Sequence, residues 1–264
     1  MVEAPAVPAA QPVALITGAS SGIGAALARA LASVGYTVAL LARRRERLEA
    51  VAAAIAANGG RAMVLVADAT DREVVQRAVD EVLRTTGRLD VVVANAGVYV
   101  RGAATAVTAT DIEAALRDNF WSAFHLAQAA LPTLRAQRSG HLVFINSFDA
   151  KKGLPSDAAY VAAKCALAGY AGTLRQALRA DGVHVCSVFP GRVDTAMTEG
   201  LAVPAISAKI TPERVARAVL RALRRRSAEV VVPWHCRFLL WAEVLSPRLA
   251  DWLVRVLRID GAMR

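Results

Sequence analysis

Thr17-Gly18-Ala19-Ser20-Ser21-Gly22-Ile23-Gly24 follows a short apolar run, Val13 to Thr17, and opens an alanine-rich segment with helical spacing. Because glycine has no Cβ, a chain with this composition can turn tightly and bring its backbone N–H groups close to a pyrophosphate at the start of a helix. This strand, turn and helix predict a dinucleotide-binding α/β fold. The residues expected around the phosphates are Gly18, Ser20, Ser21, Gly22, Ile23 and Gly24.

Six further β-rich apolar runs alternate with helical patterns along the chain. They lie at Thr37–Leu41, Ala62–Val66, Leu89–Asn95, His141–Ser147, His184–Pro190 and Glu229–Val232. Helices are expected to begin near Gly22, Arg44, Asp71, Thr110, Asp157 and Thr211. Repeated βα units with right-handed crossovers predict an α/β fold: a Rossmann-like, doubly wound, seven-stranded parallel sheet with helices on both faces. The ligand crevice of such a sheet lies beyond the carboxyl ends of its strands.

The chain has 264 residues, of which 55% are hydrophobic and only 5% aromatic, and no Pro/Gly/Ser-rich linker divides it. We therefore expect a single domain over residues 13–232, with a substrate lid at about 196–210, followed by an amphipathic helical extension over residues 233–264. Residues 1–12 contain three prolines and no basic segment before an apolar one. They are interpreted as a disordered leader and not as a secretory or transit signal.

Charge, cysteine and histidine patterns limit the classes of partner. The formal net charge of +10 suits a negatively charged partner, but the sequence has no nucleic-acid recognition motif or aromatic platform, so we expect no nucleic-acid binding. The cysteines are far apart and the histidines lack ligand spacing, which argues against a metal site. Widely spaced cysteines are typical of a reducing compartment and predict a cytoplasmic protein, with membrane association left open.

The second strand ends in Leu41-Ala42-Arg43-Arg44-Arg45, with no carboxylate before Glu46. In a dinucleotide fold an acid at this point accepts hydrogen bonds from the ribose hydroxyls, whereas an arginine pairs with a 2′-phosphate. The sequence therefore predicts NADP(H) as the cofactor. Arg43 is the first candidate for the phosphate and Arg44 the second.

Tyr160 and Lys164 are four residues apart, and Ser147 precedes Tyr160 by 13 residues. On a helix, this spacing places the phenol and the ammonium on one face. The cation would favour phenolate and lower the tyrosine pKa from its usual value of about 10. Tyr160 is then a candidate general acid for carbonyl reduction, with the Ser147 hydroxyl donating a hydrogen bond to the developing alkoxide.

In order and spacing, these motifs resemble the short-chain dehydrogenase/reductase family, in its NADP(H)-preferring group. TGASSGIG is similar to the TGxxxGxG turn, Asn95-Ala96-Gly97 to the NAG motif, and Pro190-Gly191-Arg192-Val193-Asp194-Thr195 to the PGxVxT segment. The catalytic tetrad of the family falls on Asn119, Ser147, Tyr160 and Lys164. The resemblance further implies cofactor contacts from Asp68, Ala69, Asn95, Ala96, Gly97, Tyr160, Lys164, Pro190, Gly191, Val193 and Thr195.

The resemblance also implies roles for individual residues. Asp68 would bind the adenine amino group, Lys164 would bind the nicotinamide ribose, and Asn119 would link Lys164 to solvent through its main chain and a water. Pro190 to Thr195 would contact the carboxamide. Members of this family are commonly dimers or tetramers through two long helices, so a homodimer or homotetramer is expected.

The sequence specifies the substrate-binding residues less closely than the cofactor-binding ones. Phe148 and Asp149 follow Ser147 where a specificity loop is expected, although a surface turn explains the charged part equally well. Residues Met197 to Ile210 are mostly apolar and suit a lid over a hydrophobic substrate. The extension has an amphipathic pattern. Apolar residues recur at helical spacing, at Leu249, Trp252, Leu253, Val256 and Leu257, and charged residues occupy the other side, at Arg248, Asp251, Arg255 and Arg258. The extension is too short in its apolar runs to span a membrane.

Three roles for this extension remain open: packing on its own domain or on a second copy, a wall for a lipid-like substrate, and peripheral membrane contact. The predicted function is NADP(H)-dependent interconversion of a secondary alcohol and a ketone on a hydrophobic, steroid-, retinoid- or long-chain-like small molecule. The alternative is a catalytically silent NADP(H) sensor or partner-binding protein.

Overall fold

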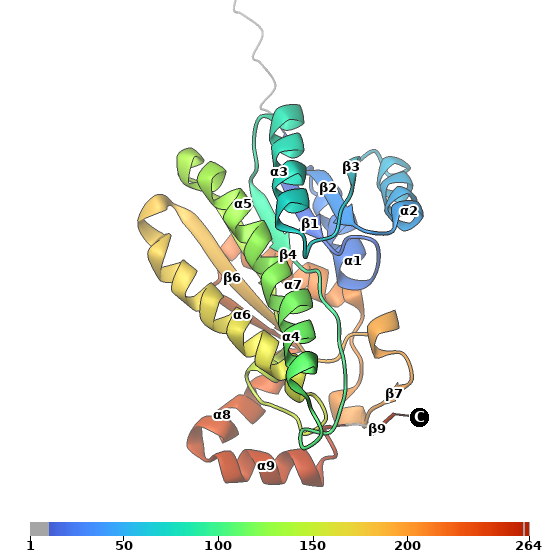
Figure 1. Cartoon of the computed structure of the whole chain (residues 1–264), viewed down its shortest axis with the longest axis vertical. Helices are drawn as coiled ribbons and strands as arrows, with labels where there is room; N and C mark the ends of the chain where they lie inside the picture. Colours follow the sequence, from blue (N-terminus) through green and yellow to red (C-terminus); the bar gives the residue numbers. More distant parts are fainter. Residues whose placement is uncertain (1–10, 261, 264) are drawn as a thin grey trace, which may run out of the picture.

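A computed structural model describes residues 11–260 and 262–263, with only the backbone given for Ile206, Ala262 and Met263. Of the segment expected as a leader, residues 1–10 lie outside the described residues. Figure 1 shows one central sheet with helices packed on both of its faces and a pair of helices at one end.

The seven strands of the central sheet are those expected from the sequence. They are β1 (Val13–Thr17), β2 (Thr37–Ala42), β3 (Arg61–Val66), β4 (Val91–Ala94), β5 (Gly140–Ile145), β6 (Val183–Pro190) and β8 (Glu229–Val232). Their order is β3-β2-β1-β4-β5-β6-β8, and every neighbouring pair is parallel. The order reverses between β1 and β4, which creates a crevice beyond the carboxyl ends of these two strands.

The helices divide between the two faces of the sheet. Helices α1 (Gly22–Ala32), α2 (Arg45–Ala56) and α7 (Pro212–Arg225) bury residues in the core on one face, and α3 (Arg72–Thr86), α5 (Ser122–Gln137) and α6 (Ala158–Ala177) do so on the other. The starts agree with the sequence because side-chain caps set them locally. Asp71 accepts hydrogen bonds from two backbone N–H groups of α3, and Thr211 caps α7 ahead of Pro212.

Helix α4 (Ala109–Leu116) continues into α5 through a π-helical turn, Arg117–Trp121, which the sequence did not predict. A π turn widens the helix by one residue and is often found at functional sites. Asn119 lies within it, so the local widening places this residue.

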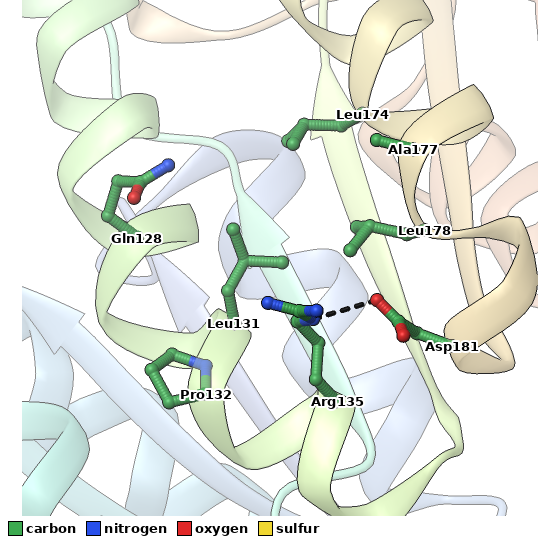
Figure 2. Close-up of a pocket in the computed structure, with 8 residues that line it drawn as sticks. All are labelled: Gln128, Leu131, Pro132, Arg135, Leu174, Ala177, Leu178 and Asp181. Atoms are coloured by element: carbon green, nitrogen blue, oxygen red, sulfur yellow. Dashed lines mark hydrogen bonds and ion pairs between the residues drawn. The ribbon is translucent and has the colours of Figure 1, made fainter.

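On the α5–α6 side, a groove of about 520 Å³ runs between the C-terminal halves of the two helices. Figure 2 shows its lining residues facing one another across the groove, and Arg135 and Asp181 form an ion pair of 2.7 Å at one side. Leu174 in this groove is 14 residues beyond Tyr160, which is about 21 Å along the helix. The groove is thus separate from the predicted catalytic residues.

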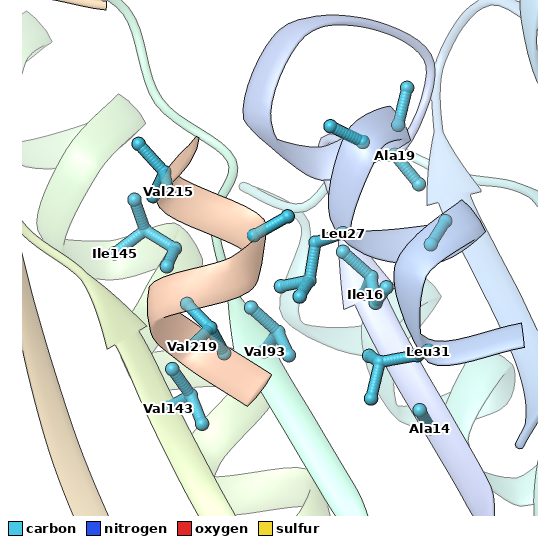
Figure 3. Close-up of a cluster of buried hydrophobic side chains, with 14 of the residues drawn as sticks. Ala14, Ile16, Ala19, Leu27, Leu31, Val93, Val143, Ile145, Val215 and Val219 are labelled. Atoms are coloured by element: carbon cyan, nitrogen blue, oxygen red, sulfur yellow. The ribbon is translucent and has the colours of Figure 1, made fainter. Parts of the chain in front are cut away.

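On the opposite face, alanine, valine and leucine side chains fill the space between the sheet and helices α1 and α7. Figure 3 shows Ile16 and Val93 from the sheet meeting Leu27, Leu31 and Val219 from the helices. These five residues have no exposed surface. Small side chains let the helices approach the sheet closely, which explains the low aromatic content.

The C-terminal extension forms a helical hairpin, α8 (Arg237–Leu245) and α9 (Pro247–Val256), at the lower end of the molecule in Figure 1. Ser246 caps α9 and Pro247 is its first residue, as predicted. Beyond it, β9 (Ala262–Met263) pairs antiparallel with β7 (Leu201–Ala202), so the chain returns to the segment expected to be a lid. Within the part of the chain that the structure describes, we find no helix with the length and hydropathy needed to cross a membrane.

The apolar residues predicted for α9 differ in their exposure. Ala250 and Val254 are buried on α9, which packs against α8, whereas Leu249, Trp252 and Val256 are exposed. The small residues Ala242 and Ala250 are buried where α8 and α9 pack closely, and the large side chains are left on the outside.

Candidate active site

The glycine turn forms a cradle at the carboxyl end of β1. Gly18 has a φ of +66° and Gly22 a φ of +54°, left-handed values that glycine adopts without strain. A Cβ on Gly24 would clash with the carbonyl oxygen of Gly18, and a Cβ on Gly18 would meet Asn95 Nδ2 at 2.8 Å. The turn therefore requires these glycines and leaves the backbone at the N-terminus of α1 open to a pyrophosphate.

Asn95 and Thr17 fasten this cradle to β4. The Asn95 side-chain amide donates to the carbonyl oxygens of Thr17 and Gly18, at 2.9 and 3.3 Å. The Thr17 hydroxyl accepts from the backbone N–H groups of Asn95 and Ala96, at 3.0 and 3.1 Å. The two strands on either side of the crevice are thus held together where the sheet order reverses.

The arginines after β2 take different positions. Arg44 donates from Nη2 to the hydroxyls of Ser20 and Ser21, at 2.9 and 3.0 Å, so it faces the glycine turn. Burial and the charges of Arg47 and Arg43 lower the Arg44 pKa, a sign of an excess of positive charge. Arg43 is instead more than three-quarters exposed and approaches Asp68 at 3.7 Å. The geometry thus places Arg44, the second candidate from the sequence, closer to the turn than Arg43.

Asp68 lies at the far side of this nucleotide region, after β3. Its carboxylate accepts hydrogen bonds from the backbone and hydroxyl of Thr70, at 2.9 and 2.8 Å. Burial raises the Asp68 pKa, but the two hydrogen bonds and the charges of Arg43 and Arg117 outweigh it and hold the pKa below its usual value. Asp68 is therefore a carboxylate and can accept a hydrogen bond. The neighbouring Ala69 is buried.

Ser147, Tyr160 and Lys164 are all buried at the carboxyl end of β5 and the start of α6. Lys164 Nζ lies 5.6 Å from the centre of the Tyr160 ring and donates a hydrogen bond of 3.1 Å to the carbonyl oxygen of Ile145. Tyr99 packs edge-on against the Tyr160 ring, with 5.0 Å between the ring centres. The structure brings the serine, the tyrosine and the lysine together as the sequence predicts.

The pKa of Tyr160 differs from the expectation that Lys164 would lower it. Burial, followed by the charge of Asp149, raises the Tyr160 pKa, and the interaction with the Ser147 hydroxyl only partly offsets this rise. Burial lowers the Lys164 pKa to about 8, although Asp149 opposes the shift. The Lys164 amine is directed at a backbone carbonyl, so in this state the phenol is held in its protonated form.

Asn119 lies behind these residues. Its side-chain amide donates to the carbonyl oxygens of Val98 and Ala115, both at 3.0 Å, and its oxygen accepts from the Val98 backbone N–H. A Cβ on Gly97 would clash with this side-chain oxygen and lie 3.7 Å from Lys164 Nζ. Gly97 is therefore the residue that lets the β4 end, Asn119 and Lys164 approach one another.

The segment after β6 forms the other wall. Pro190 ends the strand, Gly191 donates its backbone N–H to the Val232 carbonyl at 2.7 Å, and Val193 is buried. A Cβ on Gly22 would meet the methyl group of Thr195 at 3.0 Å, which places Thr195 directly against the glycine turn. The two segments therefore face each other across the crevice.

The two candidates for the specificity loop separate in the structure. Phe148 is buried against Phe189 and Val231, with Leu239 and Leu240 of α8 packed on the same cluster, so it anchors the extension and does not line the crevice. Asp149 turns the other way, and the Ser147 hydroxyl donates to its carboxylate at 3.0 Å. Burial and the charge of Asp157 raise the Asp149 pKa to about 6.

Sequence reasoning missed a charged network beside this site. Asp157, which has no exposed surface, accepts hydrogen bonds from Tyr99 at 2.9 Å and from Arg101 at 3.1 Å. Arg101 and Ser156 also bind the carboxylate of Asp260, at 3.1 and 2.8 Å. No local pattern could have found this network, because its members come from the loop after β4, the loop before α6 and the C-terminal segment.

The family model for short chain dehydrogenase matches residues 12–203. This chain belongs to the short-chain dehydrogenase/reductase family. Ketoacyl reductase HetN of Nostoc sp. is 33% identical over 221 residues, which cover 83% of this chain and 77% of the relative. The protein is thus an oxidoreductase of a family that uses nicotinamide dinucleotides and acts on small molecules.

Solved structures agree with this assignment. A metagenomic short-chain oxidoreductase in complex with NADP is 33% identical and covers 84% of this chain and 96% of its own, with a TM-score of 0.72. A short-chain dehydrogenase/reductase of Burkholderia phymatum in complex with NAD shows the same fold, with a TM-score of 0.83, 23% identity, and 90% and 95% of the two chains covered. The predicted fold class is confirmed.

The residues present fit a dinucleotide. The glycine cradle at the N-terminus of α1 and the cationic Arg44 beside Ser20 and Ser21 offer backbone donors and a positive charge to phosphates. Opposite them, Ser147 and Tyr160 are the hydroxyl groups at the carboxyl end of β5. Phosphate-binding and proton-donating groups thus share one crevice.

Proposed function

We propose that this protein is an NADP(H)-dependent oxidoreductase that interconverts a secondary alcohol and a ketone on a hydrophobic small molecule, of steroid, retinoid or long-chain type. The convergence of Ser147, Tyr160 and Lys164 beside a glycine cradle carries the proposal. The apolar lid segment and a relative named as a ketoacyl reductase support an apolar carbonyl substrate.

A bound nicotinamide cofactor would supply the hydride that reduction of the carbonyl carbon requires. The Tyr160 hydroxyl gives its proton to the carbonyl oxygen, so the ketone gains one hydride and one proton and becomes an alcohol. Because burial keeps the phenol protonated, the donor is ready before substrate arrives. Ser147 must turn its hydroxyl from Asp149 to the substrate oxygen in order to stabilise the developing charge.

Lys164 and Asn119 are proposed to resupply protons to Tyr160. Lys164 has a pKa of about 8 and is therefore only partly protonated near that pH, which suits a group that passes protons to Tyr160. Asn119 sits in the π turn beside Gly97, and its neighbouring backbone is the proposed link from Lys164 to solvent. The proposed cofactor contacts are the cradle, Asp68, the Asn95-Ala96-Gly97 segment and the Pro190 to Thr195 wall.

The test is turnover of NADPH with a panel of apolar ketones, including long-chain 3-ketoacyl thioesters. Tyr160→Phe should lower kcat by about 100-fold or more, because general acid catalysis contributes at least that much, while NADPH binding measured by fluorescence is retained. Unchanged turnover in Tyr160→Phe would exclude the proposed proton donor. NADPH binding without turnover of any ketone would instead support a silent sensor.

For the choice of cofactor, we propose that Arg44 binds the 2′-phosphate and that Arg43 contributes less. Arg44→Ala should weaken NADPH binding by about 10-fold to 100-fold, the range expected for a lost charge-assisted hydrogen bond, and leave NADH binding unchanged. Arg45→Ala is the matched control, because Arg45 pairs with Glu49 within α2. An equal loss for both nucleotides would contradict the assignment.

We also propose a homodimer or homotetramer that forms through the outer surfaces of α5 and α6. An aromatic cluster of Phe120, Trp121, Phe124 and Tyr170 lies on this side, and Trp121 is 45% exposed. The groove in Figure 2 continues the same surface along both helices. A second copy would cover this apolar surface.

A further inference from the structure

The outer face of the α8–α9 hairpin is an exposed apolar surface. Eight large hydrophobic side chains on it are between 43% and 84% exposed. They are Trp234, Phe238, Trp241, Val244, Leu245, Leu249, Trp252 and Val256. Scattered apolar residues are normal on a protein surface, but a contiguous group of this size marks a binding face. We call these eight residues the outer hairpin face.

Aromatic rings of the outer hairpin face adjoin one another, and the two helices that carry the face pack together. Trp234 and Phe238 pack edge to face with 5.6 Å between ring centres, and Phe238 and Trp241 do so at 5.3 Å. Helices α8 and α9 lie against each other, and their inner sides are buried through Ala242 and Ala250. The large side chains therefore project from two helices that packing holds in place.

Charges on the hairpin are distributed unevenly. Its two acidic residues, Glu243 and Asp251, both bind Lys152 of the main domain, at 2.6 and 2.7 Å. Burial lowers the Lys152 pKa, but the hydrogen bonds from the two carboxylates outweigh this and raise it, so the three charges neutralise one another in part. The two carboxylates of the hairpin thus help to hold it against the domain.

The basic residues of the hairpin are left on the outside. Arg237, Arg248, Arg255 and Arg258 are exposed, and none of the ion pairs between described residues includes them. The surface beyond the domain therefore consists of aromatic and aliphatic side chains bordered by four guanidinium groups. Tryptophan and arginine in this arrangement are typical of helices that lie in the interface of a bilayer.

A second copy of the chain fits this surface poorly. Two outer hairpin faces brought together would gather eight arginines at one contact, and the chain already carries a net charge of +10. Like charges at a contact oppose association, whereas anionic lipid headgroups would supply the missing negative charge. We propose that the outer hairpin face docks this protein onto the surface of a membrane that contains anionic phospholipids.

Docking would place the crevice close to the bilayer. Leu239 and Leu240 on the inner side of α8 pack on Phe148, the residue next to Ser147. The hairpin thus connects the catalytic loop to the membrane-facing side, and an apolar substrate could reach the lid without crossing much water. This inference concerns where the protein binds and does not depend on the reaction that it catalyses.

The test is co-sedimentation of the full chain with vesicles of phosphatidylcholine alone or with 30 mol% phosphatidylglycerol, a proportion of about one lipid in three chosen to give a surface potential. We expect binding to the anionic vesicles that falls at high salt, and at least about 10-fold weaker binding for Trp241→Glu. Val34→Glu, which changes another exposed apolar residue far from the hairpin, should bind like the wild type.

Two further measurements do not rely on a destabilised variant. Tryptophan fluorescence of the wild type should shift to the blue on addition of anionic vesicles and should be quenched by brominated acyl chains. Arg248→Gln with Arg255→Gln should weaken binding to anionic vesicles while thermal stability is retained. Wild-type protein that binds neither vesicle type, or a Trp241→Glu variant that binds as well as the wild type, would overturn the proposal. So would a fall in oligomer size on Trp241→Glu, which would show that a second copy covers this face.

Discussion

Asp149 and Ser147 share a hydrogen bond at the point where substrate oxygen is expected. The carboxyl lies among Asp157, Arg192 and Asp260, and burial is the largest cause of its raised pKa of about 6. A carboxyl with a higher pKa in the folded than in the unfolded chain holds its proton more tightly when folded. Its contribution to stability is therefore complete below about pH 4 and is lost as the pH rises through about 6.

Asp149→Asn should remove this pH dependence, because the amide stays neutral. Relative to the wild type, the variant should gain stability between about pH 4 and 6 and keep a gain of about 1–2 kcal/mol above that range. Urea unfolding at several pH values measures the difference. A stability difference between the two proteins that stays constant from acid to neutral pH would contradict this account of Asp149.

At the level of single residues, the positions that the structure gives to the candidate site residues follow from the sequence where motifs are local. The glycine turn and the spacing of Ser147, Tyr160 and Lys164 lead directly to their observed positions, because strand ends and one helix set them. The tyrosine pKa was not predictable, since it depends on burial and on Asp149. Which of Arg43 and Arg44 faces the turn depends on side-chain direction, which composition does not specify.

Among the elements, the segment after α9 is tied to the crevice by a single residue. Asp260 accepts hydrogen bonds from Arg101 and Ser156 through its carboxylate, and from Arg101 and Arg192 through its backbone carbonyl. Two residues further on, β9 pairs with β7, which lies in the proposed lid. The proposed lid and the C-terminal segment are therefore joined by backbone pairing.

Asp260→Ala should loosen this pairing more than the core. Loss of hydrogen bonds to a charged partner costs about 1.5–3 kcal/mol, so backbone amides at Leu201 and Ala202 should exchange with deuterium at least about 10-fold faster. Amides of β1 and β4 should keep their protection. Ser156→Ala removes only one of the carboxylate contacts and should give a smaller effect. Equal exchange at β7 in wild type and Asp260→Ala would contradict this role.

Element boundaries were predictable to within one or two residues, because caps such as Asp71 and the Ser246-Pro247 pair act locally. The π turn at Asn119 and the pairing of β7 with β9 were not. The π turn depends on how the helix packs beside the crevice. The pairing of β7 with β9 joins residues about sixty positions apart. Periodicity alone carries no information on either feature.

For the whole molecule, two apolar surfaces lie on different sides, and they should have different partners. The aromatic cluster around Trp121 lies on the α5–α6 layer, whereas the outer hairpin face belongs to α8 and α9, at the lower end in Figure 1. The first is proposed to meet a second copy of the chain, and the second a lipid surface. A mutation in one surface should therefore leave the other interaction intact.

Trp121→Glu should convert the proposed oligomer to a single chain, because it would bury a charge in an apolar contact. Light scattering coupled to gel filtration measures the mass, and Trp241→Glu, with a charge on the other surface, is the matched control that should keep the wild-type assembly. Helix content from circular dichroism shows whether each variant is folded. A folded Trp121→Glu variant with the wild-type mass would exclude this face as the interface.

The antiparallel pairing of β7 with β9 would link the proposed lid over the crevice to the hairpin proposed to dock on a membrane. A molecule that orders the lid also orders the strand that follows the hairpin, and coupling of this kind is reciprocal. Occupancy of the crevice and binding to a bilayer would then strengthen each other by the same factor in affinity.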